Sequence, residues 1–221
     1  MNNIKTDKLF DTKNTILEEV FNSAEYPWEI LPKIKDIIAN LLNNPPDGYT
    51  LYKEGVLVGK NVKISETATI NAPSIICDNT EIRHCAFIRG NAIILQNCVI
   101  GNSSELKNAI LLNNAQVPHF NYVGDSILGN FAHMGAGAIC SNLKADKKTV
   151  IVKSSNFGIN SNLRKFGAII GDYADVGCNS VLNPGTVIGK NTRVYPLTSI
   201  RGVIPENSIV KSIDNVVKIN I

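Results

Sequence analysis

The stretch VGKNVKISETATINAPSIICDNTEIRHCAFIRGNAIILQNCVIGNSSELKNAILL, residues 58–112, decides the fold of this chain. Every sixth residue in it is aliphatic, from Val58 and Ile64 onward to Leu112, without a miss. A second register, four residues after each aliphatic, holds small residues at all but its first and last positions. No helix has a period of six, and an ordinary strand alternates at two. The pattern therefore predicts a parallel β-helix built from hexapeptides.

In such a β-helix each hexapeptide forms one short strand and a bend, and three of them close a triangular coil of about 18 residues. The aliphatic side chain points into the prism, and the small residue lies at the corner, where a large side chain would collide. Successive coils stack at the strand spacing of ~4.8 Å. We therefore expect Ile64, Ile82 and Ile100 to stack in one column.

The rest of the chain divides around this repeat. Residues 1–50 do not repeat, and their apolar spacing over 16–21 and 30–42 predicts an N-terminal helical segment. We expect it to cover an open end of the β-helix or to join subunits, with Trp28 packed in the core. The β-helix domain should span residues 51–221. The repeat is lost near 113–121 and 143–166, which predicts two loops there, and residues 203–221 should form a closing strand or cap.

Composition excludes several classes of protein. A net charge of +3 is too weak to indicate a nucleic-acid partner. The five cysteines are scattered without a CxxC pair, which favours buried reduced thiols over disulfides or zinc. The N-terminus is polar and no apolar run is long enough to cross a membrane. We expect a cytoplasmic protein without a membrane partner.

Charged residues suggest where chemistry takes place. Arg89 and Lys107 are 18 residues apart, so the repeat stacks them on one outer face of adjacent coils. Two stacked cations repel unless an anion lies between them, which indicates a phosphate or carboxylate site; a solvated basic face is the alternative. The second loop is rich in lysine and arginine, and either covers a phosphate-bearing ligand or is simply solvated. Of the histidines, His119 and His133 are candidate general bases, whereas His84 has no expected role.

Several motifs resemble the acetyltransferase half of the bacterial bifunctional glucosamine-1-phosphate acetyltransferase/uridylyltransferase and, more closely, archaeal sugar-1-phosphate nucleotidyltransferases with a C-terminal β-helix. The matching runs are Glu105-Leu106-Lys107, His119-Phe120-Asn121-Tyr122-Val123-Gly124-Asp125, Met134-Gly135-Ala136-Gly137, Ser141-Asn142 and Arg164-Lys165-Phe166-Gly167. The resemblance covers residues from about 55 to 210. It implies a left-handed β-helix, a homotrimer with its site between two subunits, and transfer of an acetyl group from acetyl-CoA to an amino-sugar phosphate, without a metal.

The resemblance also implies a role for individual residues. His119 would be the general base, with Glu105 near it and Asn142 at the reacting amine. The backbone N–H near Ala136 would face the thioester oxygen. The remaining matches fall into two sets: acceptor-binding Arg89, Lys107, Tyr122, His133 and Lys148, and cofactor-binding Ala136, Lys165 and Cys178.

The chain departs from the family pattern in places. His133 and Leu143 stand where relatives carry an asparagine and a tyrosine, which leaves the acceptor sugar open. Residues 1–50 hold no strand–loop–helix unit with a Gly-rich nucleotide loop, so we expect no nucleotidyltransferase domain in this chain.

Two other functions remain as alternatives. A γ-class carbonic anhydrase shares the trimeric left-handed β-helix, but it needs two metal-binding histidines five residues apart, and no pair here has that spacing. A non-catalytic trimeric scaffold would need none of His119, Lys107, Arg89, Tyr122 or Asn142 for packing.

Overall fold

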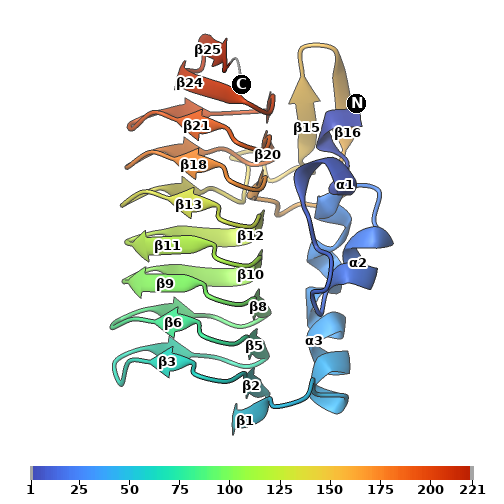
Figure 1. Ribbon diagram of the computed structural model, residues 1–221. Coiled ribbons are helices and arrows are strands. Elements are labelled where there is room, and N and C mark those ends of the chain that lie inside the picture. Colours follow the sequence, from blue (N-terminus) through green and yellow to red (C-terminus); the bar gives the residue numbers. More distant parts are fainter. Residues whose placement is uncertain (1, 220–221) are drawn as a thin grey trace.

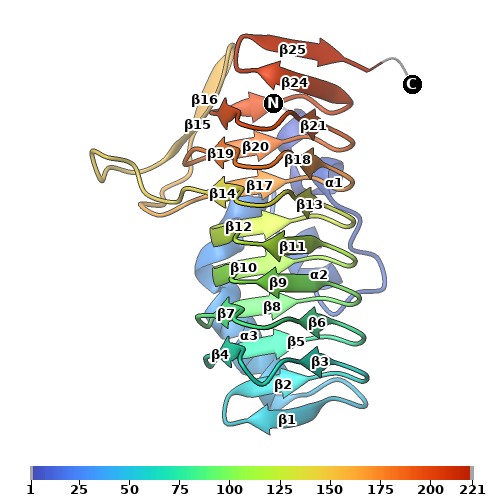
Figure 2. The ribbon, with the colours of Figure 1, turned by 90° about the vertical axis from the view of Figure 1, so that its left-hand side faces the viewer.

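The computed structural model describes residues 2–219 and shows a mainly β chain wound around a triangular prism (Figure 1). Seen from two sides, the coils climb from β2 to β24 with a left-handed turn, as the resemblance implies (Figure 2). The prism is built from β2 (Val56–Val58), β3 (Lys63–Ile64), β4 (Thr69–Ile70), β5 (Ser74–Ile76), β6 (Glu81–Ile82), β7 (Phe87–Ile88), β8 (Ala92–Ile94), β9 (Val99–Asn102), β10 (Glu105–Leu111), β11 (Gln116–His119), β12 (Tyr122–Leu128), β13 (His133–Met134), β14 (Ile139–Cys140), β17 (Ala168–Ile170), β18 (Asp175–Val176), β19 (Val181–Leu182), β20 (Thr186–Ile188), β21 (Arg193–Val194), β22 (Ser199–Ile200) and β23 (Val203–Ile204).

The six-residue pattern has the predicted physical meaning. Ile64 pairs with Ile82, and Ile82 pairs with Ile100, in parallel register on β3, β6 and β9. The aliphatic residues of this register form one buried core inside the prism, and corner residues such as Ala86 and Cys98 are buried with them. The parallel β-helix predicted from residues 58–112 is confirmed.

The loop predicted near 113–121 is wrong. Residues 116–119 form β11, which pairs in parallel with β9 below it and β13 above it. The repeat is lost because the coils shorten: Ile93 pairs with Ile110 and Ile110 with Ile127, 17 residues apart each time. A coil that is one residue shorter shifts every later residue by one position in the six-residue pattern, although the β-helix continues.

The interruption expected over 143–166 is present and contains structure of its own. Ile127 on β12 pairs with Ile169 on β17, 42 residues later. The chain between them completes one coil and then leaves the prism as an antiparallel hairpin of β15 (Ile151–Ser154) and β16 (Phe157–Asn160). A bridge between Leu143 and Lys165 holds the two ends of this insertion together.

The N-terminal segment contains η1 (Asn2–Ile4), α1 (Thr6–Leu9), α2 (Glu18–Asn22), η2 (Pro27–Glu29), η3 (Leu31–Lys33) and α3 (Ile34–Asn43). It lies along the side of the prism, so the expectation that it covers an open end is wrong (Figure 1). The ends are instead covered by β1 (Thr50–Lys53), which pairs with β2, and by β24 (Ser208–Ser212) with β25 (Asn215–Lys218).

The helices lie there because one sheet of the prism is apolar on its outer surface as well as on the surface that faces the core. Ile75, Ile93, Ile110 and Ile127 stack in an outward-facing column and are fully buried beneath the N-terminal segment and the insertion. Trp28 is 2% exposed and lies against Phe166 of the insertion with ring centroids 5.8 Å apart, as expected for core packing. The segment and the insertion therefore share one apolar core.

The cysteines partly follow expectation. All five are free thiols; Cys77, Cys98 and Cys140 are buried, but Cys85 and Cys178 are exposed.

None of the helices within residues 2–219 has the length and hydropathy needed to cross a membrane.

Candidate active site

Two ion pairs stack at one corner of the prism. Leu106 pairs with Ile88, which places Arg89 and Lys107 on adjacent coils as the spacing predicts. The Arg89 guanidinium lies 2.7 Å from a Glu105 carboxylate oxygen, and the Lys107 ammonium lies 3.0 Å from Asp125. Each cation therefore has its own carboxylate. The argument that an external anion must separate them no longer holds, because Glu105 and Asp125 already supply the negative charge.

Asp125 lies at the centre of this cluster. Its side chain is 6% exposed and its φ of 47° is in the left-handed region, where aspartate is tolerated better than most residues. Besides Lys107, the carboxylate accepts hydrogen bonds from the side-chain amides of Asn108, at 3.0 Å, and Asn142. The Asn142 amide also donates to the Tyr122 hydroxyl at 3.3 Å. We call Arg89, Glu105, Lys107, Tyr122, Asp125 and Asn142 the Asp125 cluster.

Two features fix the cluster in place. The Asn108 amide also donates to the Leu31 carbonyl at 3.3 Å, which ties the cluster to the N-terminal segment. Val123, rather than Tyr122, fills the interior position on β12, so the Tyr122 side chain lies outside the prism. Burial raises the pKa of Tyr122, so its hydroxyl stays protonated at neutral pH and can donate a hydrogen bond.

His119 lies in a different column, around the corner from this cluster. The pairing of Gln116 with His133 places His119 against Ala136 on the next coil. Ala136 in turn lies below Cys178, because His133 pairs with Asp175 and the strands stay in register. The His119 side chain is exposed and makes no hydrogen bond to another described residue. The structure thus brings together the proposed base and two of the three proposed cofactor residues.

A buried asparagine fixes the corner between His119 and Tyr122. The Asn121 side chain accepts a hydrogen bond from the His119 N–H at 3.1 Å and donates to the Gly135 carbonyl at 2.8 Å. Phe120, with φ 52°, turns the chain between the two faces. The backbone at His119 and at Tyr122 is therefore fixed on either side of one corner.

The other predicted residues lie apart from the Asp125 cluster. His133 Nδ1 lies 2.8 Å from Asp175, and this hydrogen bond lowers the pKa of Asp175. Lys148 and Lys165 are exposed on the insertion, and no hydrogen bond or ion pair within residues 2–219 joins either one to the cluster. His84 is exposed two coils below His119.

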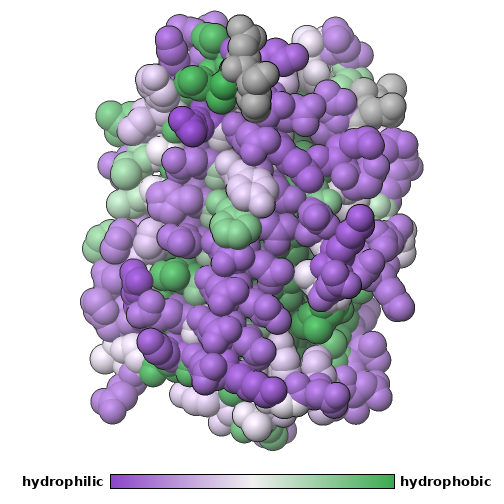
Figure 3. Space-filling view, viewed as in Figure 1, coloured by the Kyte–Doolittle hydropathy of each residue, from purple (hydrophilic) through white to green (hydrophobic). Residues whose placement is uncertain are grey.

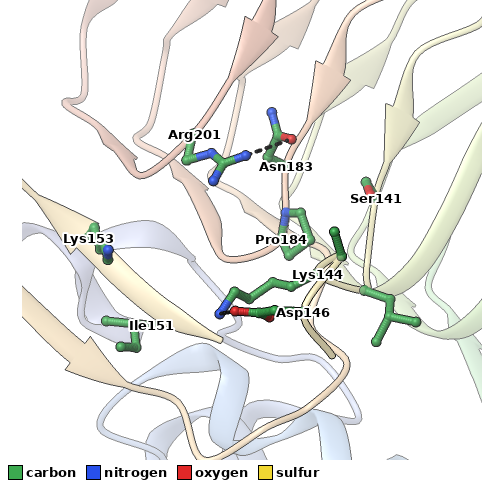
Figure 4. Close-up of a pocket in the computed structure, with 10 residues that line it drawn as sticks. Ser141, Lys144, Asp146, Ile151, Lys153, Asn183, Pro184 and Arg201 are labelled. Carbon is green, nitrogen blue, oxygen red and sulfur yellow. Dashed lines mark hydrogen bonds and ion pairs between the residues drawn. The ribbon is translucent and has the colours of Figure 1, made fainter. Parts of the chain in front are cut away.

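A pocket opens between the insertion and the upper coils, with a volume of about 430 Å³ (Figure 4). Sequence reasoning missed several of its residues, because they come from strands that only the fold places beside the insertion. We call it the insertion pocket. It is lined by Ser141, Leu143, Lys144, Ala145, Asp146, Ile151, Lys153, Asn183, Pro184 and Arg201.

The described residues contain no cluster of three or more His, Cys, Asp or Glu side chains suited to a metal ion.

Comparison with known proteins finds relatives over most of this chain. Residues 71–163 match the family model described as the GMPPB C-terminal domain. A bifunctional protein GlmU of Methanococcus aeolicus is 32% identical over 201 residues, 90% of this chain and 49% of the relative. A bifunctional sugar-1-phosphate nucleotidylyltransferase/acetyltransferase of Sulfurisphaera tokodaii is 33% identical over 175 residues, 77% of this chain and 43% of the relative. The chain thus spans about half the length of these curated relatives or less.

Among solved structures, the N-acyltransferase AntD of Bacillus cereus matches with a TM-score of 0.44 and 18% identity, over 79% of this chain and 90% of AntD. The fold and its repeat define a hexapeptide-repeat β-helix protein. Within that class, the chain is a homologue of bifunctional GlmU proteins and of a sugar-1-phosphate nucleotidylyltransferase/acetyltransferase.

Proposed function

We propose that this chain is an acetyl-CoA-dependent N-acetyltransferase that acts on an amino-sugar phosphate, with His119 as the general base. One observation carries the proposal: the corner fixed by Asn121 presents on one face an exposed imidazole, without a hydrogen bond to any described residue, and on the next face the polar Asp125 cluster. A base and a polar acceptor site side by side are what transfer to an amine needs. The name of the Sulfurisphaera tokodaii homologue includes an acetyltransferase, which agrees with this reaction class.

In the proposed reaction, the acceptor amine attacks the thioester carbonyl carbon of acetyl-CoA. His119 takes the proton that the nitrogen loses, and a backbone N–H near Ala136 donates to the carbonyl oxygen as it gains negative charge. The C–S bond then breaks, and the imidazolium returns its proton to the leaving thiolate. The products are the N-acetylated sugar and CoA with a free thiol.

The acceptor would bind at the Asp125 cluster. The Arg89 guanidinium and the Lys107 ammonium keep unused N–H donors beyond those given to Glu105 and Asp125, so each can still donate to a phosphate oxygen. Tyr122 and Asn142 provide uncharged groups for sugar hydroxyls and the amine. Both sides of this corner are open in a single chain, which favours a homotrimer in which a neighbouring subunit completes the site.

A thiol-release assay tests the proposal. The purified chain is mixed with acetyl-CoA and a panel of amino-sugar phosphates, together with the matching unphosphorylated sugars. We expect CoA release that depends on the acceptor, and a product heavier by one acetyl group. No acceptor-dependent release across the panel would contradict the proposed function.

A further inference from the structure

The insertion pocket carries more unpaired positive charge than the Asp125 cluster does. Its lining includes the cations of Lys144, Lys153 and Arg201 and the single acid Asp146, a formal balance of +2. The Asp125 cluster holds two cations and two carboxylates, a balance of zero. An anion is therefore attracted more strongly to the insertion pocket than to the stacked pair Arg89 and Lys107.

Two of the pocket cations have no carboxylate partner among the described residues. Lys144 lies 3.1 Å from Asp146, so these two charges largely offset each other. Neither Lys153 nor Arg201 forms a salt bridge within the part of the chain that the structure describes. The side-chain carbonyl of Asn183 accepts a hydrogen bond from the Arg201 guanidinium at 3.4 Å, which orients the guanidinium without neutralising it.

The pocket is assembled from two separate parts of the fold. Figure 4 shows Lys153 on the hairpin, with Arg201 and Asn183 on the coils around the same hollow. Ser141, Asn183 and Arg201 stack on successive coils, because Cys140 pairs with Leu182 and Leu182 with Ile200. The hairpin therefore brings one cation over a column that already presents another.

The size and lining of the pocket indicate the class of ligand. A volume of about 430 Å³ exceeds that of a single phosphate and leaves room for the group that the phosphate carries. Leu143, Ile151 and Pro184 give the pocket apolar walls beside its cations. A guanidinium and an ammonium across a partly apolar hollow suit a phosphate ester or a diphosphate.

We infer that the insertion pocket binds a phosphate ester or diphosphate group through Lys153 and Arg201. Ser141 lines the pocket and directly precedes Asn142 of the Asp125 cluster, so the two sites are neighbours along the chain. The inference rests on the proposed function only for the source of the phosphate. That source is either the phosphates of CoA or the phosphate of the acceptor sugar.

Calorimetric titration of the full chain tests the inference and separates the two sources. The probes are CoA, dephospho-CoA, glucosamine-1-phosphate and inorganic pyrophosphate. We expect Arg201→Gln and Lys153→Gln each to weaken at least one of these by about tenfold or more. Loss confined to the CoA probes assigns the pocket to the cofactor, and loss confined to glucosamine-1-phosphate assigns it to the acceptor. Lys153→Arg should keep binding, because it keeps the charge.

The matched control is Arg193→Gln, which removes an exposed arginine of β21, outside the pocket, that forms no salt bridge with any described residue. If Arg193→Gln weakens binding of the probes as much as the pocket variants do, the effect is one of general charge and the inference is overturned. Unchanged affinity in both Arg201→Gln and Lys153→Gln would also overturn it. So would a wild-type chain that binds none of the probes. Binding is measured without acetyl transfer. If the chain binds a probe through Lys153 and Arg201 but releases no CoA thiol, the proposed function is contradicted and the inference about the insertion pocket stands.

Discussion

The Lys107 ammonium lies 3.0 Å from both carboxylate oxygens of Asp125, on the next coil of the prism. The lysine side chain is 25% exposed and the aspartate side chain 6%, so the pair is largely removed from water. Asn108 and Asn142 donate to the same carboxylate. Asp125 therefore orients a cation and two amides at the proposed acceptor site.

Removing the Asp125 carboxylate should lower the stability of the fold. Asp125→Ala leaves the Lys107 charge half-buried and unpaired, together with two amide donors, so we expect a loss of about 2–4 kcal/mol in the free energy of unfolding. Urea denaturation measures this loss. The double variant Lys107→Met with Asp125→Ala should lose less than the sum of the single variants, because no unpaired charge remains; additive losses would show that the pair is not coupled.

The outward-facing column of Ile75, Ile93, Ile110 and Ile127 should contribute to stability as core residues do. Ile110 is fully buried, and we expect Ile110→Ala to cost about 2–5 kcal/mol in the free energy of unfolding. The matched control is Ile139→Ala, at an outward position on β14 that is 38% exposed, where we expect a cost below about 1 kcal/mol. Similar losses in the two variants, measured by urea denaturation, would mean that the helices do not cover this face.

The five cysteines should separate by their reactivity. Burial raises the pKa of Cys77 and Cys140 to about 12, and it raises the pKa of Cys98 as well. At pH 8 these three thiols are almost entirely protonated and inaccessible, so a thiol reagent should label only Cys85 and Cys178 in the native chain. Labelling in denaturant should reach all five.

The same reagent locates the proposed cofactor site. If acetyl-CoA binds along the column of His119, Ala136 and Cys178, it should slow the labelling of Cys178 and leave Cys85 unaffected. Mass spectrometry of the labelled peptides resolves the two positions. Equal rates with and without acetyl-CoA at Cys178 would place the cofactor elsewhere.

The proposed homotrimer has a direct test. A neighbouring subunit is expected to complete the open corner between His119 and the Asp125 cluster. Light scattering at micromolar concentration should give about three times the chain mass of 24.0 kDa. A monomer that still transfers acetyl groups would contradict the shared site.

The repeat alone predicted the prism, because an aliphatic residue every six positions suits only stacked coils, as Ile64, Ile82 and Ile100 show. It could not predict the 17-residue coils. A coil that is one residue shorter keeps its strands, but every later aliphatic residue then falls one position early in the six-residue pattern. The place of the N-terminal segment was visible in part. Ile93 and Ile110 each precede an inward aliphatic residue, so both sides of their strands are apolar, and such strands are covered on both faces.

The candidate site was predicted less completely. Spacing placed Lys107 above Arg89, but it said nothing of the partners Glu105 and Asp125, whose contacts depend on side-chain direction. Asp125 lies 18 residues after Lys107, the one signal that could have paired them. Arg201 could not be connected with Lys153 from sequence, because the hairpin approaches the upper coils only after folding.

The central claim is that His119 accepts the amine proton, and steady-state kinetics of His119→Ala beside His133→Ala tests it most directly. With acetyl-CoA and an amino-sugar phosphate that the wild-type chain acetylates, His119→Ala should lower kcat by on the order of 10²–10⁴, with little change in the affinity for acetyl-CoA. His133→Ala should keep most of the activity, since His133 pairs with Asp175 rather than with the Asp125 cluster. Near-full activity in His119→Ala together with loss of activity in His133→Ala would contradict the assignment.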